Sequence, residues 1–141
     1  MGGLGQDMKA VVTVLRLIFG LHFLLNGLNF FFHFFAIPTP HSVMANQVMH
    51  AFVDSGMFGI AKTTEVLAGI ALLTNRFVPA ALVLAFPVAV VIGYVDVVLI
   101  GTWFGGWVLG GGTVLLNGIL LLAYVNYYKP FLVFRSEPSL G

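Results

Sequence analysis

The stretch AVVTVLRLIFGLHFLLNGLNFFFHFFA (Ala10–Ala36) decides the fold of this chain. At about 1.5 Å of helix per residue it is long enough to cross the roughly 30 Å hydrocarbon core of a bilayer. Four polar side chains interrupt it at positions i, i+4, i+7 and i+11, and we call them the polar stripe: His22, Asn26, Asn29 and His33. At about 100° per residue they share one narrow helical face. Because unpartnered polar groups are costly in lipid, the stripe must face protein, water or a ligand.

Composition places the whole chain in a membrane. Of its 141 residues 60% are apolar and 8% are charged, whereas a soluble domain carries about 25% charged residues. A core of this size cannot hide so much apolar surface from water, so the lipid bilayer must be its solvent. The net charge of +1 and the lack of basic runs argue against nucleic acid as a partner. With no cysteine, disulfides, thiol catalysis and thiolate metal sites are excluded within the chain.

Hydropathy and turn residues predict an all-α membrane protein, a four-transmembrane-helix bundle that forms a single domain over residues 1–141. The expected spans are about 10–36, 57–73, 78–100 and 109–127. Between the first two, Pro38–Gly56 shows a moderate amphipathic pattern, which predicts a short interfacial helix.

The connections carry their own signals. We expect a tight turn at Thr74–Arg76, a glycine-rich connection at Gly101–Gly112 and a polar tail after Lys129-Pro130. Pro87 should kink the third span and free a carbonyl for a neighbour such as Asn117.

Four spans leave both termini on one side of the membrane. The basic residues outside the spans gather on that side: Lys9, Arg76, Lys129 and Arg135. The positive-inside rule therefore predicts cytoplasmic termini.

Glu65 is the most telling single residue, because it lies near the middle of the second span. A carboxylate there must be paired, hydrated or protonated. Lys62 stands three residues before it on the same face, and Arg16 can either snorkel to the inner surface or reach toward Glu65. Two interpretations stay open: a proton-active carboxylate or polar-ligand site, and a buried ion pair that fixes helix packing.

The polar stripe has parallel interpretations. His22 and His33 lie about 16 Å apart along a helix, so they cannot bind one metal together. Haem or metal would need His41 or His50 beside His33 and is not favoured over a hydrogen-bonded packing network, a hydrated cavity or a quinone-type pocket. We expect the stripe to face the second span and to meet Glu65.

Two further groups complete the candidate site. Asp96 is either an interfacial carboxylate or a second acid, and Asn117 can hydrogen-bond inward. The intramembrane polar cluster, a possible ligand or proton site, comprises Arg16, His22, Asn26, Asn29, His33, Lys62, Glu65, Asp96 and Asn117. No complete catalytic constellation and no phosphate-binding loop is present in the sequence.

Three stretches together resemble a known family: LRLIFGLHFLLNGLNFFFHFFAIPTP (Leu15–Pro40), KTTEVLAGIALLTNRFVPAALVLAFPV (Lys62–Val88) and YYKPF (Tyr127–Phe131). Their order and landmarks resemble the DoxX-like family of small bacterial integral membrane proteins. The resemblance implies four helices in the bacterial cytoplasmic (inner) membrane. It also implies a possible link to quinone-coupled or thiol redox chemistry. Where relatives carry Asn and His in the third span, this chain has Val91 and Asp96.

Three functions follow as hypotheses. The first is an accessory or structural subunit of a membrane assembly, whose partner is another membrane protein or a second copy of the chain. The second is a redox-linked protein that binds a quinone or a lipid, which as an enzyme would be an oxidoreductase subunit. The third is a proton-coupled carrier of a small solute, with Glu65 as the coupling acid.

Overall fold

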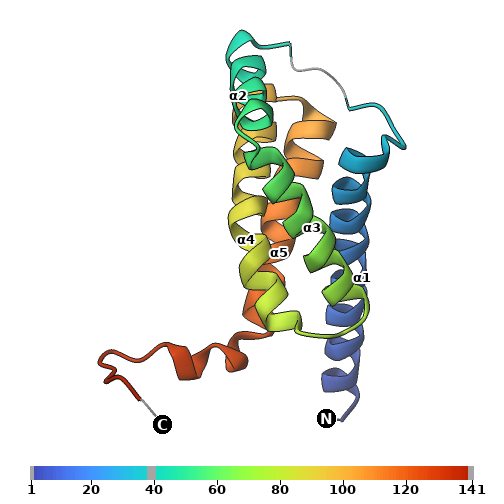
Figure 1. Cartoon of the computed structure of the whole chain (residues 1–141). Helices are drawn as coiled ribbons and strands as arrows, with labels where there is room; N and C mark the ends of the chain where they lie inside the picture. Colours follow the sequence, from blue (N-terminus) through green and yellow to red (C-terminus); the bar gives the residue numbers. More distant parts are fainter. Residues whose placement is uncertain (1, 38–40, 140–141) are drawn as a thin grey trace.

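The computed structural model describes residues 2–37 and 41–139, and every regular element in these ranges is helical (Figure 1). The all-α prediction is therefore confirmed. The larger elements are α1 (Gly2–Phe32), α2 (Val43–Asp54), α3 (Met57–Leu73), α4 (Val78–Tyr94), the π-helical segments η1 (Val95–Ile100) and η2 (Trp103–Gly111), and α5 (Gly112–Ala123). Two short 3-10 turns follow, η3 (Val125–Tyr127) and η4 (Lys129–Phe131).

Several helices have the length and composition of membrane spans. Three qualify alone: Gly3–Phe32, Val78–Ile100 and Trp103–Ala123. α2 and α3 qualify only as a pair, and the chain bends by 79° between them, so the described residues hold three spans, or four if the bent pair is one. By length and composition the chain is a multi-pass membrane protein.

The middle of the chain folds within the predicted bounds. α3 covers the second predicted span, and α4 with η1 covers the third. The turn between α3 and α4 is also as expected. The hydroxyl of Thr74 donates to the carbonyl of Ile70 at 2.8 Å, and Asn75 and Phe77 adopt left-handed φ angles of 56° and 53°. Pro79 stands in the first turn of α4, where its missing N–H costs nothing.

The predicted first span is wrong at its C-terminal end, and its helix starts before the predicted span does. The helix begins at Gly2, so the polar lead before Ala10 is helical. At the other end α1 stops at Phe32, four residues early. The reason is Asn29, whose side chain accepts from the N–H of Phe35 at 2.8 Å and donates to its carbonyl at 3.0 Å. These bonds replace the helical ladder.

The predicted glycine-rich connection is also wrong, because most of it is π-helix. The link from η1 to η2 is only Gly101 and Thr102, and the last span runs from Trp103 to Ala123, ending before Tyr127. The Thr102 hydroxyl accepts from the N–H of Gly106 at 3.1 Å and so caps η2. A Cβ on Gly106 would lie 2.5 Å from the Asp96 carbonyl, so that glycine allows close packing of η1 on η2.

The helix predicted within Pro38–Gly56 is present as α2, although Pro38, Thr39 and Pro40 lie outside the described residues. Ser42 caps it, since its hydroxyl accepts from the N–H of Ala45 at 3.2 Å. Pro87 lies inside α4, which continues through it to Tyr94.

Two antiparallel helices, α1 and α3, lie side by side, and α4 packs along α5 (Figure 1). Glycines allow the first contact: a Cβ on Gly69 would lie 2.7 Å from the backbone nitrogen of Leu24. Buried apolar side chains from four helices fill the centre, the largest being Phe19, Phe23, Leu72, Leu82 and Leu120. Exposed apolar side chains cover much of the outside, as expected for helices in lipid.

Candidate functional site

Lys62 and Glu65 form a buried ion pair within α3. The Lys62 Nζ lies 2.8 and 2.9 Å from the two carboxylate oxygens of Glu65, and both residues are buried. The ring of Phe58 lies 5.2 Å from the same Nζ and adds a cation–π contact. The predicted reach of Lys62 to Glu65 is confirmed. Both hydrogen bonds that Glu65 makes with the described residues go to Lys62.

Arg16 points away from this pair. Its guanidinium donates to the Oδ1 of Asn75, in the turn between α3 and α4. Of the two predicted directions, the structure therefore shows the one toward the end of the bundle, and Arg16 does not bond to Glu65. The Arg16 Nε is buried and has no hydrogen-bond partner among the described residues.

His22 joins α1 to α5 through a chain of hydrogen bonds. Its Nε2 lies 3.0 Å from the Thr113 Oγ1, and the Thr113 hydroxyl donates to the carbonyl of Leu109 at 2.6 Å. Because that hydroxyl proton is committed, His22 must be the donor, with its proton on Nε2. Its Nδ1 then accepts from the Nδ2 of Asn26 at 3.1 Å, and Asn26 also donates to the His22 carbonyl at 2.8 Å. The chain ends on a backbone carbonyl.

The other two residues of the polar stripe, Asn29 and His33, do not belong to this chain of hydrogen bonds. Asn29 is occupied by the backbone of Phe35, and His33 is exposed with a left-handed φ of 55°. The expectation that the stripe meets Glu65 is wrong, because its members bond to α5, to each other and to the end of α1. Because α1 ends at Phe32, His33 no longer lies on the helical face of the other three residues.

Asp96 enters the interior from η1. Its side chain lies so close to Gly110 that a Cβ on that glycine would overlap it. The carboxylate is half-buried and accepts no hydrogen bond from the described residues, while Lys62 lies within electrostatic range of both Asp96 and His22. The structure thus brings Lys62 and Glu65 into contact, and it leaves Asp96 and His22 without a hydrogen bond to either of them among the described residues.

Asn117 is fully buried on α5, on the same face as Thr113 and Leu120. Neither its Oδ1 nor its Nδ2 has a hydrogen-bond partner among the described residues. The prediction that Asn117 satisfies a carbonyl freed by Pro87 is therefore wrong.

Nothing in residues 2–37 and 41–139 forms a metal centre. No three side chains from His, Asp or Glu there lie close enough to hold one ion. The conceivable grouping of His33, His41 and His50 is not formed.

Two shallow grooves carry polar atoms. One, of about 210 Å³, lies between α1 and the last span and has His22 and Thr113 in its lining, with Phe19, Leu109 and Leu116. The other, of about 370 Å³, lies at the end of α1 beside Asn29 and His33. Typical ligand pockets have a volume of roughly 300–1,000 Å³, so the groove beside His22 and Thr113 is small for a ligand site.

Sequence reasoning missed Thr113, although it stands four residues before Asn117 and so on the same helical face. It also missed Asn75 as the partner of Arg16. Comparison of the chain with protein-family models, curated proteins and solved structures finds no match. The geometry of the polar groups alone therefore has to suggest the function.

Proposed function

We propose that this chain is a small DoxX-like membrane protein that serves as a structural or accessory subunit of a membrane assembly. The observation that carries this proposal is that its best-defined polar groups find their bonding partners within the chain itself. Lys62 and Glu65 neutralise each other, and the chain from Asn26 through His22 and Thr113 ends on the Leu109 carbonyl. The His22–Thr113 bond holds α1 to α5, the ion pair cancels the charge within α3, and both leave little for a substrate.

The proposed topology has four spans in a bacterial cytoplasmic membrane, with α3 as the second span and α2 as an interfacial helix. The 79° bend between α2 and α3 supports it, since a helix lying in the interface must turn sharply into a span. With 17 residues, α3 is about 26 Å long, close to the thickness of the hydrocarbon core. Cytoplasmic termini would place Lys9, Arg76 and Lys129 together on the inner side.

Purification from the native membrane in a mild detergent, followed by mass spectrometry of the intact complex, tests this function. We expect the chain to leave the membrane with a membrane-protein partner, or a second copy, in a fixed ratio. Extraction into lipid nanodiscs without detergent controls for dissociation. A chain that is monomeric under both conditions, and that no cross-linker joins to another protein in the membrane, would contradict the proposal.

The groove beside His22 favours a second candidate, the binding of a quinone or a lipid. Its walls are apolar; a quinone carbonyl there would have to take the Nε2–H of His22 from Thr113, whereas a hydroxyl head group would donate to the Thr113 oxygen. Thermal unfolding of the purified protein with and without added ubiquinone tests this. A ligand that binds there should raise the unfolding temperature of the wild type, and the Thr113→Val variant should lose that rise. Equal temperatures with and without the quinone in wild type would count against it.

A further inference from the structure

The segment that follows α5 is apolar as well as charged. Phe131, Leu132, Val133 and Phe134 are 81%, 75%, 56% and 97% exposed. Lys129 and Arg135 flank these four residues. We call residues 129–135 the C-terminal tail. The prediction of a polar tail after Lys129-Pro130 is therefore wrong for the four positions Phe131–Phe134, and so large a run of exposed apolar side chains needs an apolar environment.

The tail is tied to the end of the bundle. The hydroxyl of Tyr128 donates to the carbonyl of Pro79 at 3.0 Å, which joins the start of the tail to the first turn of α4. From there the chain runs sideways, across the direction of the helices and away from the bundle (Figure 1). If the helices cross a membrane, this direction lies in the plane of its surface.

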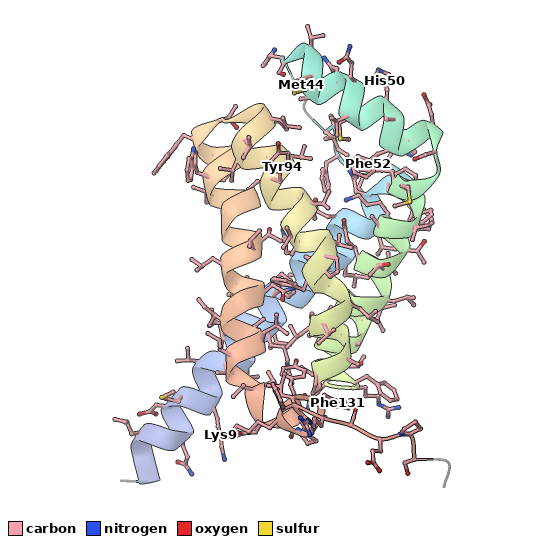
Figure 2. All side chains as sticks on the ribbon, turned by 90° about the vertical axis from the view of Figure 1, so that its left-hand side faces the viewer. Lys9, Met44, His50, Phe52, Tyr94 and Phe131 are labelled. Atoms are coloured by element: carbon pink, nitrogen blue, oxygen red, sulfur yellow. The ribbon has the colours of Figure 1, made fainter. Side chains whose placement is uncertain are left out.

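Other groups at this end match the tail in chemistry. The turn between α3 and α4 exposes Arg76 and the ring of Phe77 at the same end of the bundle. Figure 2 shows Lys9 and Phe131 both at this end as well. The end thus combines exposed aromatic rings with basic side chains, which is the pattern of residues that anchor a protein at a membrane surface.

We propose that the C-terminal tail, together with the Arg76–Phe77 turn, docks on the anionic head-group layer of the bilayer. The four apolar side chains of the tail enter the boundary between head groups and acyl chains. Lys129 and Arg135 bind lipid phosphates, because their long stems let the charged ends stay in the polar layer.

Charge decides between lipid and a second copy as the occupant. In a symmetric dimer built on this surface, the same patch would face itself. The other copy would then bring a second set of these cations, Lys129, Arg135 and Arg76, to the same surface. An anionic lipid surface offers the opposite charge, and it lies next to this end in any orientation of the spans.

The absence of cysteine makes a clean depth measurement possible. A nitroxide is attached to the full chain at Phe134→Cys, Ser136→Cys or Asp54→Cys, and each protein is reconstituted in vesicles. The vesicles contain phosphatidylcholine alone or with phosphatidylglycerol. Accessibility to oxygen, which concentrates in lipid, is compared with accessibility to a water-soluble nickel complex.

We expect the label at position 134 to favour oxygen several-fold over the nickel complex, and more so in the anionic vesicles. The labels at 136 and 54 should favour the nickel complex. Preference for the nickel complex at 134 in both lipid mixtures would overturn the proposal. So would spin–spin broadening at 134 that disappears on dilution with unlabelled protein, since that result would identify a second copy as the occupant.

A charge variant tests the head-group contact. The double variant Lys129→Gln with Arg135→Gln is made in the Phe134→Cys protein. It should abolish the additional preference of the label for oxygen in anionic vesicles and leave the preference in phosphatidylcholine vesicles unchanged. Lys9→Gln is the matched control, because it removes a cation from the same end but not from the tail. An unchanged depth in anionic vesicles for the double variant would show that the phosphates are not bound by these residues.

Discussion

Lys62 and Glu65 neutralise each other within one turn of one helix, with the Nζ 2.8 and 2.9 Å from the two carboxylate oxygens. The pair needs no other helix to form. It therefore leaves α3 without net charge, and it can form as soon as α3 does. The pair places no ionic bond between helices.

Removal of one partner of this ion pair should lower the free energy of unfolding far more than removal of both. Lys62→Met leaves a buried carboxylate without a cation, and breaking a buried pair in this way costs about 3–5 kcal/mol. Adding Glu65→Leu should recover most of that loss, because an apolar pair of similar volume is often neutral. Reversible unfolding of the three proteins in mixed detergent micelles measures the free energies. Equal losses for the single and the double variant would contradict the ion pair.

The hydroxyl of Thr113 is the one group that links His22 to α5 in the hydrogen-bond chain described above. Thr113→Val keeps the shape but leaves the Nε2–H of His22 without an acceptor, at a cost of about 1–3 kcal/mol. Thr113→Ser is the matched control and should lose only about 0.8 kcal/mol for its buried methyl group, since the hydroxyl remains. A serine variant as unstable as the valine variant would show that the loss comes from packing.

Two glycines on different surfaces should respond to alanine with opposite signs. In Gly69→Ala the new Cβ would meet the Leu24 backbone at 2.7 Å, so α1 and α3 must separate, which costs about 1–3 kcal/mol. Gly118→Ala meets nothing within 4 Å inside α5 and should gain about 0.5–1 kcal/mol from helix propensity. Unfolding titrations of both variants in the same micelles compare them. A stable Gly69→Ala protein would argue against the close contact of the two helices.

His33 ends α1 in a left-handed conformation with φ of 55° and an exposed side chain. Glycine adopts this conformation without steric cost, so His33→Gly should stabilise the protein by about 1 kcal/mol. His33→Ala keeps the Cβ and should show no such gain. Thermal unfolding in detergent distinguishes the two. A marked loss in both variants would instead show that the imidazole itself has a partner.

Tyr128 gives the structure a dependence on alkaline pH. Partial burial, and after it the nearby Tyr124, raise the pKa of Tyr128. The folded state therefore favours the neutral phenol, which donates to Pro79. This contribution is complete below the ordinary pKa of about 10 and is lost as the pH rises through the higher pKa of the folded state.

Stability should fall in that alkaline range, and Tyr128→Phe should lack this part of the fall while being less stable at neutral pH. Unfolding free energies measured from pH 8 upward test it. A parallel fall in both proteins would assign the effect to other groups.

The strongly apolar segments made much of the fold predictable. α3 and the third span follow from hydropathy and from the turn signals around Asn75 and Pro79. The end of α1 did not, because Asn29 bonds to backbone six residues ahead and overrides a hydropathy pattern that continues to Ala36. Glycine-rich sequence normally indicates a loop, but here Gly106 and Gly110 lie in η2, where their missing side chains leave room for Asp96.

The candidate site was predictable only where it is local. Lys62 and Glu65 are three residues apart, so helical geometry alone pairs them. The partners of His22 and Arg16 lie 91 and 59 residues away, and which helices become neighbours is not encoded in the spacing of either residue. Asn117 looked like a partner for α4, yet its buried amide bonds to none of the described residues.

The lengths of α1 and α3 have a consequence for the lipid around them. At about 1.5 Å per residue, the 31 residues of α1 extend about 46 Å and the 17 of α3 about 26 Å, although the two helices pack side by side. The apolar part of α1, Ala10–Phe32, extends about 34 Å, slightly more than a bilayer core of about 30 Å, whereas α3 is slightly shorter than that core. If α3 crosses the bilayer as proposed, hydrophobic mismatch has opposite signs at two adjacent helices, which thins the bilayer beside α3 and tilts α1. The stability of the folded protein should therefore depend on the thickness of the bilayer, and so on the lipid mixture that surrounds it.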